Sequence, residues 1–402
     1  MAIGLIAAGS ASHPTVEAAR APFVAVWEPY WAGTAGATRF AAHADVVNEI
    51  SPFFLSATAD GSVVSVSGAA SMTAAINAAR AKGVKVIPTV TDGAGKGGMA
   101  AIIADDSARA NHIANLVATV MNGGYDGVDL DYEVFAFTDG RSTWPTTMPL
   151  WVQFVHQLSD ALHAQGRMLI VTIPPVWEAT TPGNAEQKNY WVYAQDQILP
   201  FVDRLRLMVY DWSPGTPSAN APIDKYVIPV VAYSTRVAAA TGQPASKLIL
   251  GVPAYGRHWR RSADGSPCPD GSLNTSTVTQ VSAPGVAPGV DRRRDAASGE
   301  LTFSWDEVVT GPRGASTITL PPYVQDPGTI DTVGAAGANT PAIRLGVPGS
   351  IVTCAVRHTV WYPDEWSVKA KADVAVQKGW GGVVIWAGGY EVDATYDVLA
   401  GL

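Results

Sequence analysis

Three acidic residues stand at every second position of one short run, YDGVDLDYEVF from Tyr125 to Phe135. They are Asp129, Asp131 and Glu133. Alternate side chains of a strand point to one face, so the three carboxyls share a face. Like charges at that spacing raise one another's pKa, which keeps a carboxylic acid protonated for catalysis near neutral pH. The run predicts general acid chemistry, with a metal site or a solvated edge strand as the alternatives.

A second group of chemically useful residues follows two other apolar runs. The segment LMVYDW carries Met208, Tyr210 and Asp211, and the run GGVVIW ends in Trp386. In a barrel of parallel strands, the active site is built from the C-terminal ends of the strands and the loops after them. We therefore expect these four residues to lie beside the three acids.

Eight short apolar runs are predicted to be the strands that position these residues. Seven of them alternate with longer amphipathic stretches, which is typical of repeated strand and helix units. The runs are Phe23–Trp27, Ile50–Ala57, Val84–Val90, Gly127–Asp131, Met168–Ile173, Arg204–Tyr210, Lys247–Val252 and Gly381–Trp386. Eight units favour a closed (β/α)₈ TIM barrel of the α/β class over an open sheet.

The strand and helix rhythm breaks after the seventh strand, where Pro, Gly, Ser and Thr dominate. An insertion of roughly 100 residues is too long for a plain loop. We expect a small, mainly β (α+β) subdomain over residues 257–360, with ELTFSW, PYVQD and SIVTCAVRHTVWY among its strands. The barrel then comprises residues 21–256 and 361–402, and residues 1–20 form a tail or the remnant of a secretion signal.

Both cysteines of the chain, Cys268 and Cys354, fall in the insertion. The first lies near its entry and the second near its exit, so a disulfide between them is predicted to staple the base of the subdomain. Two unrelated buried thiols are the alternative.

The composition describes a globular protein, with 47% hydrophobic and 15% charged residues. The net charge of −8 argues against a nucleic-acid or anionic-membrane partner. No apolar run reaches the roughly 18 residues of a membrane-spanning helix, so we expect no membrane insertion. The apolar start MAIGLIAAGSASHP is like the end of a secretion signal, so a secreted or cell-wall-associated monomer is expected.

The motifs together resemble glycoside hydrolase family 18, the chitinase-like (β/α)₈ enzymes. DGVDLDYE resembles the family's acidic signature, MVYD its Met-x-Tyr-Asp motif and GVPAYGR its seventh-strand segment. The final segment VWYPDEWSVKAKADVAVQKGWGGVVIWAGG is similar to bacterial cell-wall and spore-cortex hydrolases. One departure is PTVTDGAGKGG, which stands where the family has Ser-x-Gly-Gly.

The resemblance implies retaining, substrate-assisted hydrolysis, which needs one enzyme carboxyl as general acid. Glu133 would protonate the glycosidic oxygen while the 2-acetamido oxygen of the sugar attacks the anomeric carbon. Asp131 would orient the acetamido group, and Asp129 would share a proton with Asp131. No metal or organic cofactor is implied.

The remaining candidates would hold the sugar. The resemblance implies that Tyr210 bonds the acetamido carbonyl, Asp211 holds the distorted ring and Trp386 forms its apolar floor. Other residues near the expected mouth either contact substrate or pack the rim; they are Met208, Trp27, Glu28, Tyr30, Trp212, Tyr255 and Arg257.

Three functions are considered for these features. The first is hydrolysis of β-1,4 bonds next to N-acetylglucosamine, with chitin, peptidoglycan and N-glycan cores all fitting the chemistry. The second is lectin-like binding without catalysis, although relatives of that kind typically lose the terminal acid, and Glu133 is present. The third, a metal-dependent hydrolase, lacks a His cluster at the strand ends.

Overall fold

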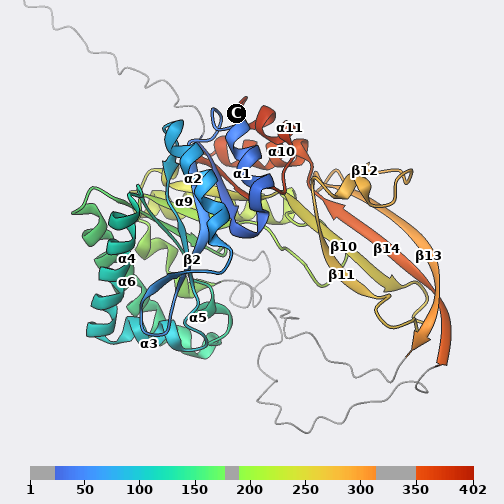
Figure 1. The fold of residues 1–402 in the computed structure, drawn as a ribbon, viewed down its shortest axis with the longest axis horizontal. Coiled ribbons are helices and arrows are strands. Elements are labelled where there is room, and N and C mark those ends of the chain that lie inside the picture. The colour runs from blue at the N-terminus through green and yellow to red at the C-terminus, as the bar shows by residue number, and fades with distance from the viewer. Residues whose placement is uncertain (1–22, 177–189, 314–349) are drawn as a thin grey trace, which may run out of the picture.

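The computed structural model describes residues 23–176, 190–313 and 350–402. Eight parallel strands close into a barrel, because the first strand pairs with both the second and the last (Figure 1). In barrel order they are β1 Phe23–Pro29, β2 Glu49–Ala57, β5 Thr89–Asp92, β6 Gly127–Asp131, β7 Met168–Ile173, β8 Arg204–Met208, β9 Leu248–Pro253 and β15 Gly382–Trp386. The prediction of a (β/α)₈ barrel is confirmed.

The third predicted strand is divided. The short β4 Lys85–Val86 pairs with β2, and β5 begins only after Pro88. Proline has no backbone N–H to donate to a sheet, so the ladder is interrupted at this position. The strand β3 Val63–Ser65 adds an antiparallel edge to β2.

Helices cover the outside of the barrel (Figure 1). The longer ones are α1 Gly33–Ala42, α2 Met72–Ala81, α3 Gly98–Ala104, α4 Asp106–Gly123, α6 Trp144–His163, α9 Ile228–Ala240, α10 Glu365–Val376 and α11 Asp393–Leu399, and the shorter ones are α5 Val134–Phe137 and α8 Gln195–Ile198. Outward side chains of the strands, such as Val128 and Leu130, are buried in the core beneath these helices.

Local signals place the acidic strand β6. The side chain of Asp105 caps α4 by accepting a hydrogen bond from the Ala108 amide at 2.8 Å. The helix ends at Gly123, and the C-cap residue Gly124 adopts a φ of 60° that suits glycine. At Gly127 a Cβ atom would lie 2.3 Å from the Met168 carbonyl oxygen, so the first residue of β6 has to be glycine.

The insertion forms a five-stranded antiparallel sheet that stands to one side of the barrel (Figure 1). Its strands, in spatial order, are β11 Asn274–Thr279, β10 Tyr255–Ser262, β14 Ser350–Tyr362, β13 Leu301–Arg313 and β12 Arg293–Arg294. The mainly β insertion is thus confirmed. The predicted strand PYVQD lies outside the described residues.

A buried glutamate joins this sheet to the barrel. The carboxylate of Glu300 accepts hydrogen bonds from the amides of Asn220 and Ala221, each at 2.8 Å, and lies 3.1 Å from the Lys371 ammonium group. Arg294 of β12 pairs with Asp364 at the start of α10. These contacts hold the near end of the sheet rigidly against the barrel.

The predicted disulfide is present, with the Cα atoms of Cys268 and Cys354 5.2 Å apart. Its predicted place at the base of the insertion is wrong. Cys354 pairs with Val309 along β14, eight residues before the barrel end of that strand at Tyr362. The bridge therefore joins the β10–β11 loop to the far half of the sheet, because β13 and β14 are long.

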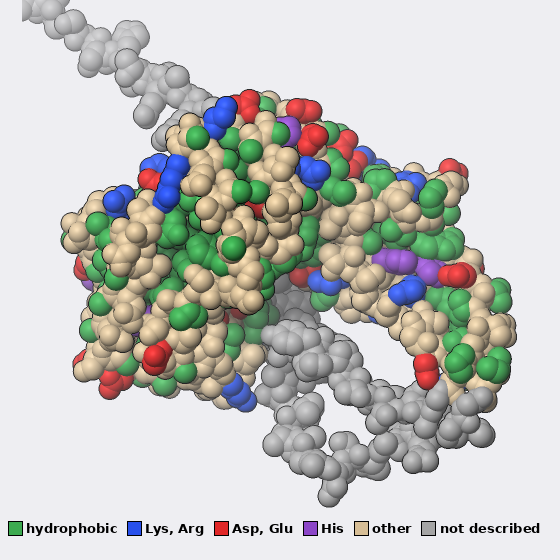
Figure 2. All heavy atoms as spheres, in the orientation of Figure 1, with side chains coloured by type: hydrophobic (Ala, Val, Ile, Leu, Met, Phe, Trp, Pro, Cys, Tyr) green, Lys and Arg blue, Asp and Glu red, His purple; other side chains and the backbone are tan. Residues whose placement is uncertain are grey.

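The surface carries charges of both signs. On the face drawn in Figure 2, the basic and acidic side chains of the described residues are interspersed. In the insertion sheet, His258 of β10 and His358 of β14 approach each other, with Nε2 and Nδ1 2.9 Å apart. Within the described ranges, no helix has both the length and the apolar character needed to span a membrane.

Candidate active site

The three acids follow one another from the inside of the barrel to its C-terminal mouth. Asp129 is fully buried on the inner face of β6, and Asp131 at the strand end is 7% exposed. Glu133 comes just past the strand and is partly exposed. The row therefore leads outward, with Glu133 as the acid that solvent reaches most easily.

Asp129 is surrounded by hydrogen-bond donors. Its Oδ2 accepts from the Trp27 indole at 2.8 Å, the Thr89 hydroxyl at 3.1 Å and the Arg206 guanidinium at 2.7 Å. Its Oδ1 accepts from the Thr172 hydroxyl at 2.7 Å. Four donors and no acceptor suit a carboxylate rather than a carboxylic acid.

Arg206 belongs to a buried ionic network in the lower half of the barrel. It bonds the Ser51 hydroxyl at 2.8 Å and pairs with Glu49, which also pairs with Arg204 at 2.6 Å. Burial raises the pKa of Glu49, and the two arginines oppose that rise. The network supplies the positive charge that a buried Asp129 carboxylate needs.

Among the residues that the structure describes, no cation pairs with Asp131 or Glu133. Burial, then the nearby Glu133 and Asp129, raise the pKa of Asp131 well above its usual range. Burial also raises the pKa of Glu133 from 4.5 to about 7, opposed by its hydrogen bond to Asp131. That bond raises the pKa of Asp131 and lowers that of Glu133, so the two carboxyls share a proton. The pair retains a proton at neutral pH.

The end of β8 brings two further candidates, Tyr210 and Asp211, to this pair. The pKa of Tyr210 is raised by burial and by neighbours that include Tyr255, Asp131 and Glu133, and its ring lies 6.0 Å from that of Tyr255. Asp211 adopts a φ of 56°, and its charge contributes to the raised pKa of Glu133. A positive φ in a residue other than glycine is a local strain that is often found at functional sites.

The insertion sheet contributes Arg257, which donates to Asp211 Oδ1 at 2.7 Å. Tyr255 and Arg257 therefore reach the mouth through β10, as the sequence predicted for the rim. Met208 is the last residue of β8 and is partly exposed.

Aromatic rings continue the site across β1, β2 and β15. The Trp386 ring lies 5.1 Å from Phe53, 5.9 Å from Trp27 and 6.1 Å from Trp31. Trp31 is 47% exposed, and its indole donates to the Tyr390 hydroxyl at 2.9 Å. The partly buried Trp386 and the exposed Trp31 form an aromatic platform, and aromatic faces of this kind stack on sugar rings.

Three rim candidates pack against other side chains of the protein. Glu28 is fully buried on the opposite face of β1, so the prediction of substrate contact finds no support. Tyr30 packs against Trp31 with ring centres 5.0 Å apart, and Trp212 packs against Tyr226 at 5.1 Å. Trp27 is 1% exposed, so it acts through its bond to Asp129 rather than by contact.

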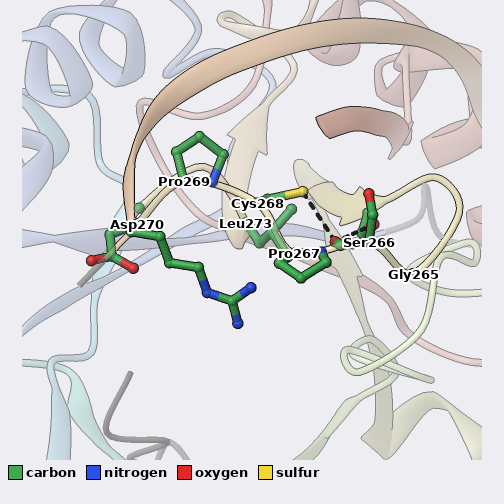
Figure 3. Close-up of a pocket in the computed structure, with 10 residues that line it drawn as sticks. Gly265, Ser266, Pro267, Cys268, Pro269, Asp270 and Leu273 are labelled. Carbon is green, nitrogen blue, oxygen red and sulfur yellow. Dashed lines mark hydrogen bonds between the residues drawn. The ribbon is translucent and has the colours of Figure 1, made fainter. Parts of the chain in front are cut away.

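A cavity of about 640 Å³ lies elsewhere, beside the disulfide (Figure 3). It is lined by the β10–β11 loop, including Cys268, Pro269, Asp270 and Leu273, and by Arg313 at the end of β13. The described residues that line it include one carboxyl, that of Asp270, so the acid cluster at the barrel mouth remains the candidate active site. Among the described residues, no group of His, Cys, Asp and Glu has an arrangement suited to a metal ion.

Comparison with known proteins agrees with this geometry. A sequence profile of the glycosyl hydrolases family 18 matches residues 26–391. The chain belongs to this family. Solved structures that share the fold include a chitinase from Chromobacterium violaceum, with a TM-score of 0.68, 24% identity and coverage of 94% of this chain and 98% of that one. The Bacillus cereus spore cortex-lytic enzyme SleL has a TM-score of 0.67 and 18% identity, covering 94% and 74%.

Two relatives are similar to this chain in sequence. Chitotriosidase-1 of Mus musculus is 25% identical over 303 residues, which cover 71% of this chain and 53% of the relative. The putative sporulation-specific glycosylase YdhD of Bacillus subtilis is 29% identical over 162 residues, covering 39% and 33%. This chain thus spans about half of the first relative's length and a third of the second's.

Three residues of this family 18 site were not predicted from the sequence. Arg206 bonds Asp129, and Asp92 accepts a hydrogen bond from the backbone amide of Glu133. Arg206 lies in a predicted strand and Asp92 just past one, but neither was named as a candidate. Trp31 directly follows the predicted rim residue Tyr30. An arginine on the inward face of an apolar strand and an acid at a strand end are the signals that could have identified the first two.

Proposed function

We propose that this chain is a retaining glycoside hydrolase that cleaves β-1,4 bonds of N-acetylglucosamine-containing glycans, with Glu133 as general acid and base. The observation that carries the proposal is the acid pair at the barrel mouth. Burial raises the pKa of Glu133 to about 7, so it can give and take a proton near neutral pH. No second carboxylate is needed as the nucleophile when the substrate supplies one.

In the first step, Glu133 gives its proton to the glycosidic oxygen as the bond to the anomeric carbon breaks. The carbonyl oxygen of the sugar's 2-acetamido group attacks that carbon and forms an oxazolinium ion. A water molecule then attacks the same carbon while Glu133 removes its proton. This opens the oxazolinium ring and leaves Glu133 protonated again. Configuration is retained because two displacements occur.

Asp131 accepts the acetamido N–H and stabilises the positive intermediate. The resemblance implied that Asp131 shares a proton with Asp129; we propose that Asp131 shares it with Glu133, since the Asp129 carboxyl already accepts four hydrogen bonds. Asp129 lies deeper in the barrel and raises the pKa of Asp131 through its charge.

The remaining residues bind the sugar. Tyr210 donates to the acetamido carbonyl, and Asp211, held by Arg257, bonds the hydroxyls of the distorted ring. Trp386 lies beneath that sugar, and Trp31 stacks on a neighbouring one.

Chitin and peptidoglycan are the proposed substrate classes, because the relatives include proteins named as a chitotriosidase and as a sporulation-specific glycosylase. The disulfide is consistent with action outside the cell, in or near a cell wall. Residues around the mouth, including the aromatic platform, would decide between the two polymers.

The test is product analysis on N-acetylated chitin oligosaccharides and on purified peptidoglycan, with the fully deacetylated oligosaccharides as the matched control. We expect cleavage only where the sugar at the cleaved bond carries an acetamido group, and inhibition by a thiazoline analogue of N-acetylglucosamine. Cleavage of the deacetylated chain at a similar rate would refute the mechanism. Binding without cleavage of any of these glycans would favour the lectin-like alternative.

A further inference from the structure

Asp92 is the last residue of β5, the strand beside β6, and its side chain is only 3% exposed. Its neighbour Thr91 stands opposite Asp131 in the parallel register. The Asp92 carboxyl therefore lies next to the acid pair, in the segment that departs from the family's Ser-x-Gly-Gly pattern.

The carboxyl of Asp92 binds three successive backbone amides. Its Oδ1 accepts from the amides of Glu133 at 3.0 Å and Val134 at 2.9 Å, and its Oδ2 accepts from Phe135 at 3.2 Å. Successive N–H groups that converge in this way form an anion-binding concavity. Here the anion is internal, and the first of the three amides belongs to the general acid of the proposed function.

A second link joins the same two loops. The Gly97 amide donates to Asp139 Oδ1 at 2.7 Å. The loop after β5 thus holds the segment after β6 at Glu133 and again six residues later. Glu133 itself lies past the end of β6, so these bonds take the place of the strand ladder in holding its backbone.

We propose that Asp92 is a positioning residue for the hydrolysis: it fixes the backbone of Glu133 and places a negative charge beside the acid pair. This inference rests on the proposed function of Glu133. It adds a residue from the neighbouring strand to the machinery and assigns a role to the segment that departs from the family pattern.

The electrostatics of the site agree with this geometry. Burial raises the pKa of Asp92 to about 6, although its bonds to the three amides oppose the rise. The charge of Asp92 is in turn one of the causes that raise the pKa of Glu133 to about 7, together with Asp211. The titratable groups facing it are Asp131 and Glu133, with the buried hydroxyls of Tyr132 and Tyr193.

The variants Asp92→Asn and Asp92→Ala test the role. We expect kcat to fall on the order of 10- to 100-fold with KM changed less, because the acid is misplaced while the sugar contacts remain. The loss of a negative charge lowers the pKa of Glu133, so the basic limb of the rate–pH profile moves to lower pH. Asp105→Asn is the control, since Asp105 also accepts a hydrogen bond from a backbone amide but does so at the start of α4, away from the site.

A merely structural role would lower the melting temperature of all three variants and leave the pH profile of each in place; that result overturns the inference. If the Asp92 variants do not fold, amide hydrogen exchange of wild type decides. Exchange of the Glu133 to Phe135 amides as slow as that of β6 supports the contact, and fast exchange overturns it. A wild type that cleaves none of the glycans refutes the proposed function, and amide exchange still tests the Asp92 contact.

Discussion

Asp129 and Asp131 stand two residues apart on the same face of one strand, yet their surroundings differ completely. Asp129 accepts four hydrogen bonds, one of them from Arg206. Asp131 has a buried Oδ1 with no hydrogen-bond partner among the described residues, and an acid as its neighbour. Spacing alone therefore does not decide what a carboxyl does, because the donors around it set its protonation.

Glu28 sharpens this lesson. Its two carboxyl oxygens are buried without a hydrogen-bond partner in the described part of the chain, and burial and Glu391 raise its pKa from 4.5 to about 8. It lies against Gly36 and Gly388, where a Cβ atom would come within 2.1 and 2.0 Å of its oxygens. A raised pKa marks a functional acid only when substrate can reach it.

The largest expected effect comes from removing the acid that substrate reaches. Glu133→Gln should lower kcat by about three orders of magnitude or more, since leaving-group protonation is lost while sugar binding survives. Steady-state kinetics and binding of a chitin oligosaccharide measure both. Activity above about a tenth of wild type would exclude Glu133 as the general acid.

The next largest effect concerns Arg206, whose charge pairs with the buried Asp129. Arg206→Met removes the cation from Asp129 and Glu49, and breaking a buried pair of this kind costs about 3–5 kcal/mol of unfolding free energy. Arg357→Met, which removes an exposed pair with Asp306, is the control and should change little. Denaturant unfolding of both variants gives the result. Equal losses would mean that Arg206 does not stabilise a charged Asp129.

The disulfide variant tests the insertion separately from the barrel. Changing Cys268 and Cys354 to Ser opens a loop with a sequence separation of 86 and should cost up to about 4 kcal/mol by the chain-entropy estimate. Because the bridge joins the far half of the sheet, hydrolysis of short oligosaccharides should stay close to wild type. Calorimetry with and without reductant, together with kinetics, provides the check. A large loss of activity in folded protein would show that the far end of the sheet contributes to the site.

The smallest effect concerns Glu28. Its folded-state pKa is raised, so wild type loses stability as pH rises from about 4.5 to about 8. Glu28→Gln removes that loss and should raise stability at pH 7 by about 1–3 kcal/mol, with turnover unchanged. Melting temperatures across this pH range test it. An equally steep pH dependence in the variant would contradict the assignment.

The acid row and the barrel could be predicted because both depend on local pattern. The alternation of Asp129, Asp131 and Glu133 and the eight apolar runs are visible along the chain. The partner of Asp129 could not be predicted in the same way, since Arg206 lies 77 residues away and reaches it inside the barrel from β8, beyond the intervening β7. The place of the disulfide was missed because it depends on the lengths of β13 and β14, which cysteine spacing does not report.

The closure of the barrel by β1 and β15 also bears on how the protein is made. The bond between Trp31 and Tyr390 joins residues 359 positions apart, and the platform at the mouth depends on both ends of the barrel. At ribosomal rates of about 5–20 residues per second, the first strand waits roughly 20–70 s for its second partner, β15. During that time β1 has an open edge on the nascent chain, where another strand could pair with it. The active site is thus among the last parts of the molecule to form, and a chain released before Trp386 would have most of the barrel but no sugar platform.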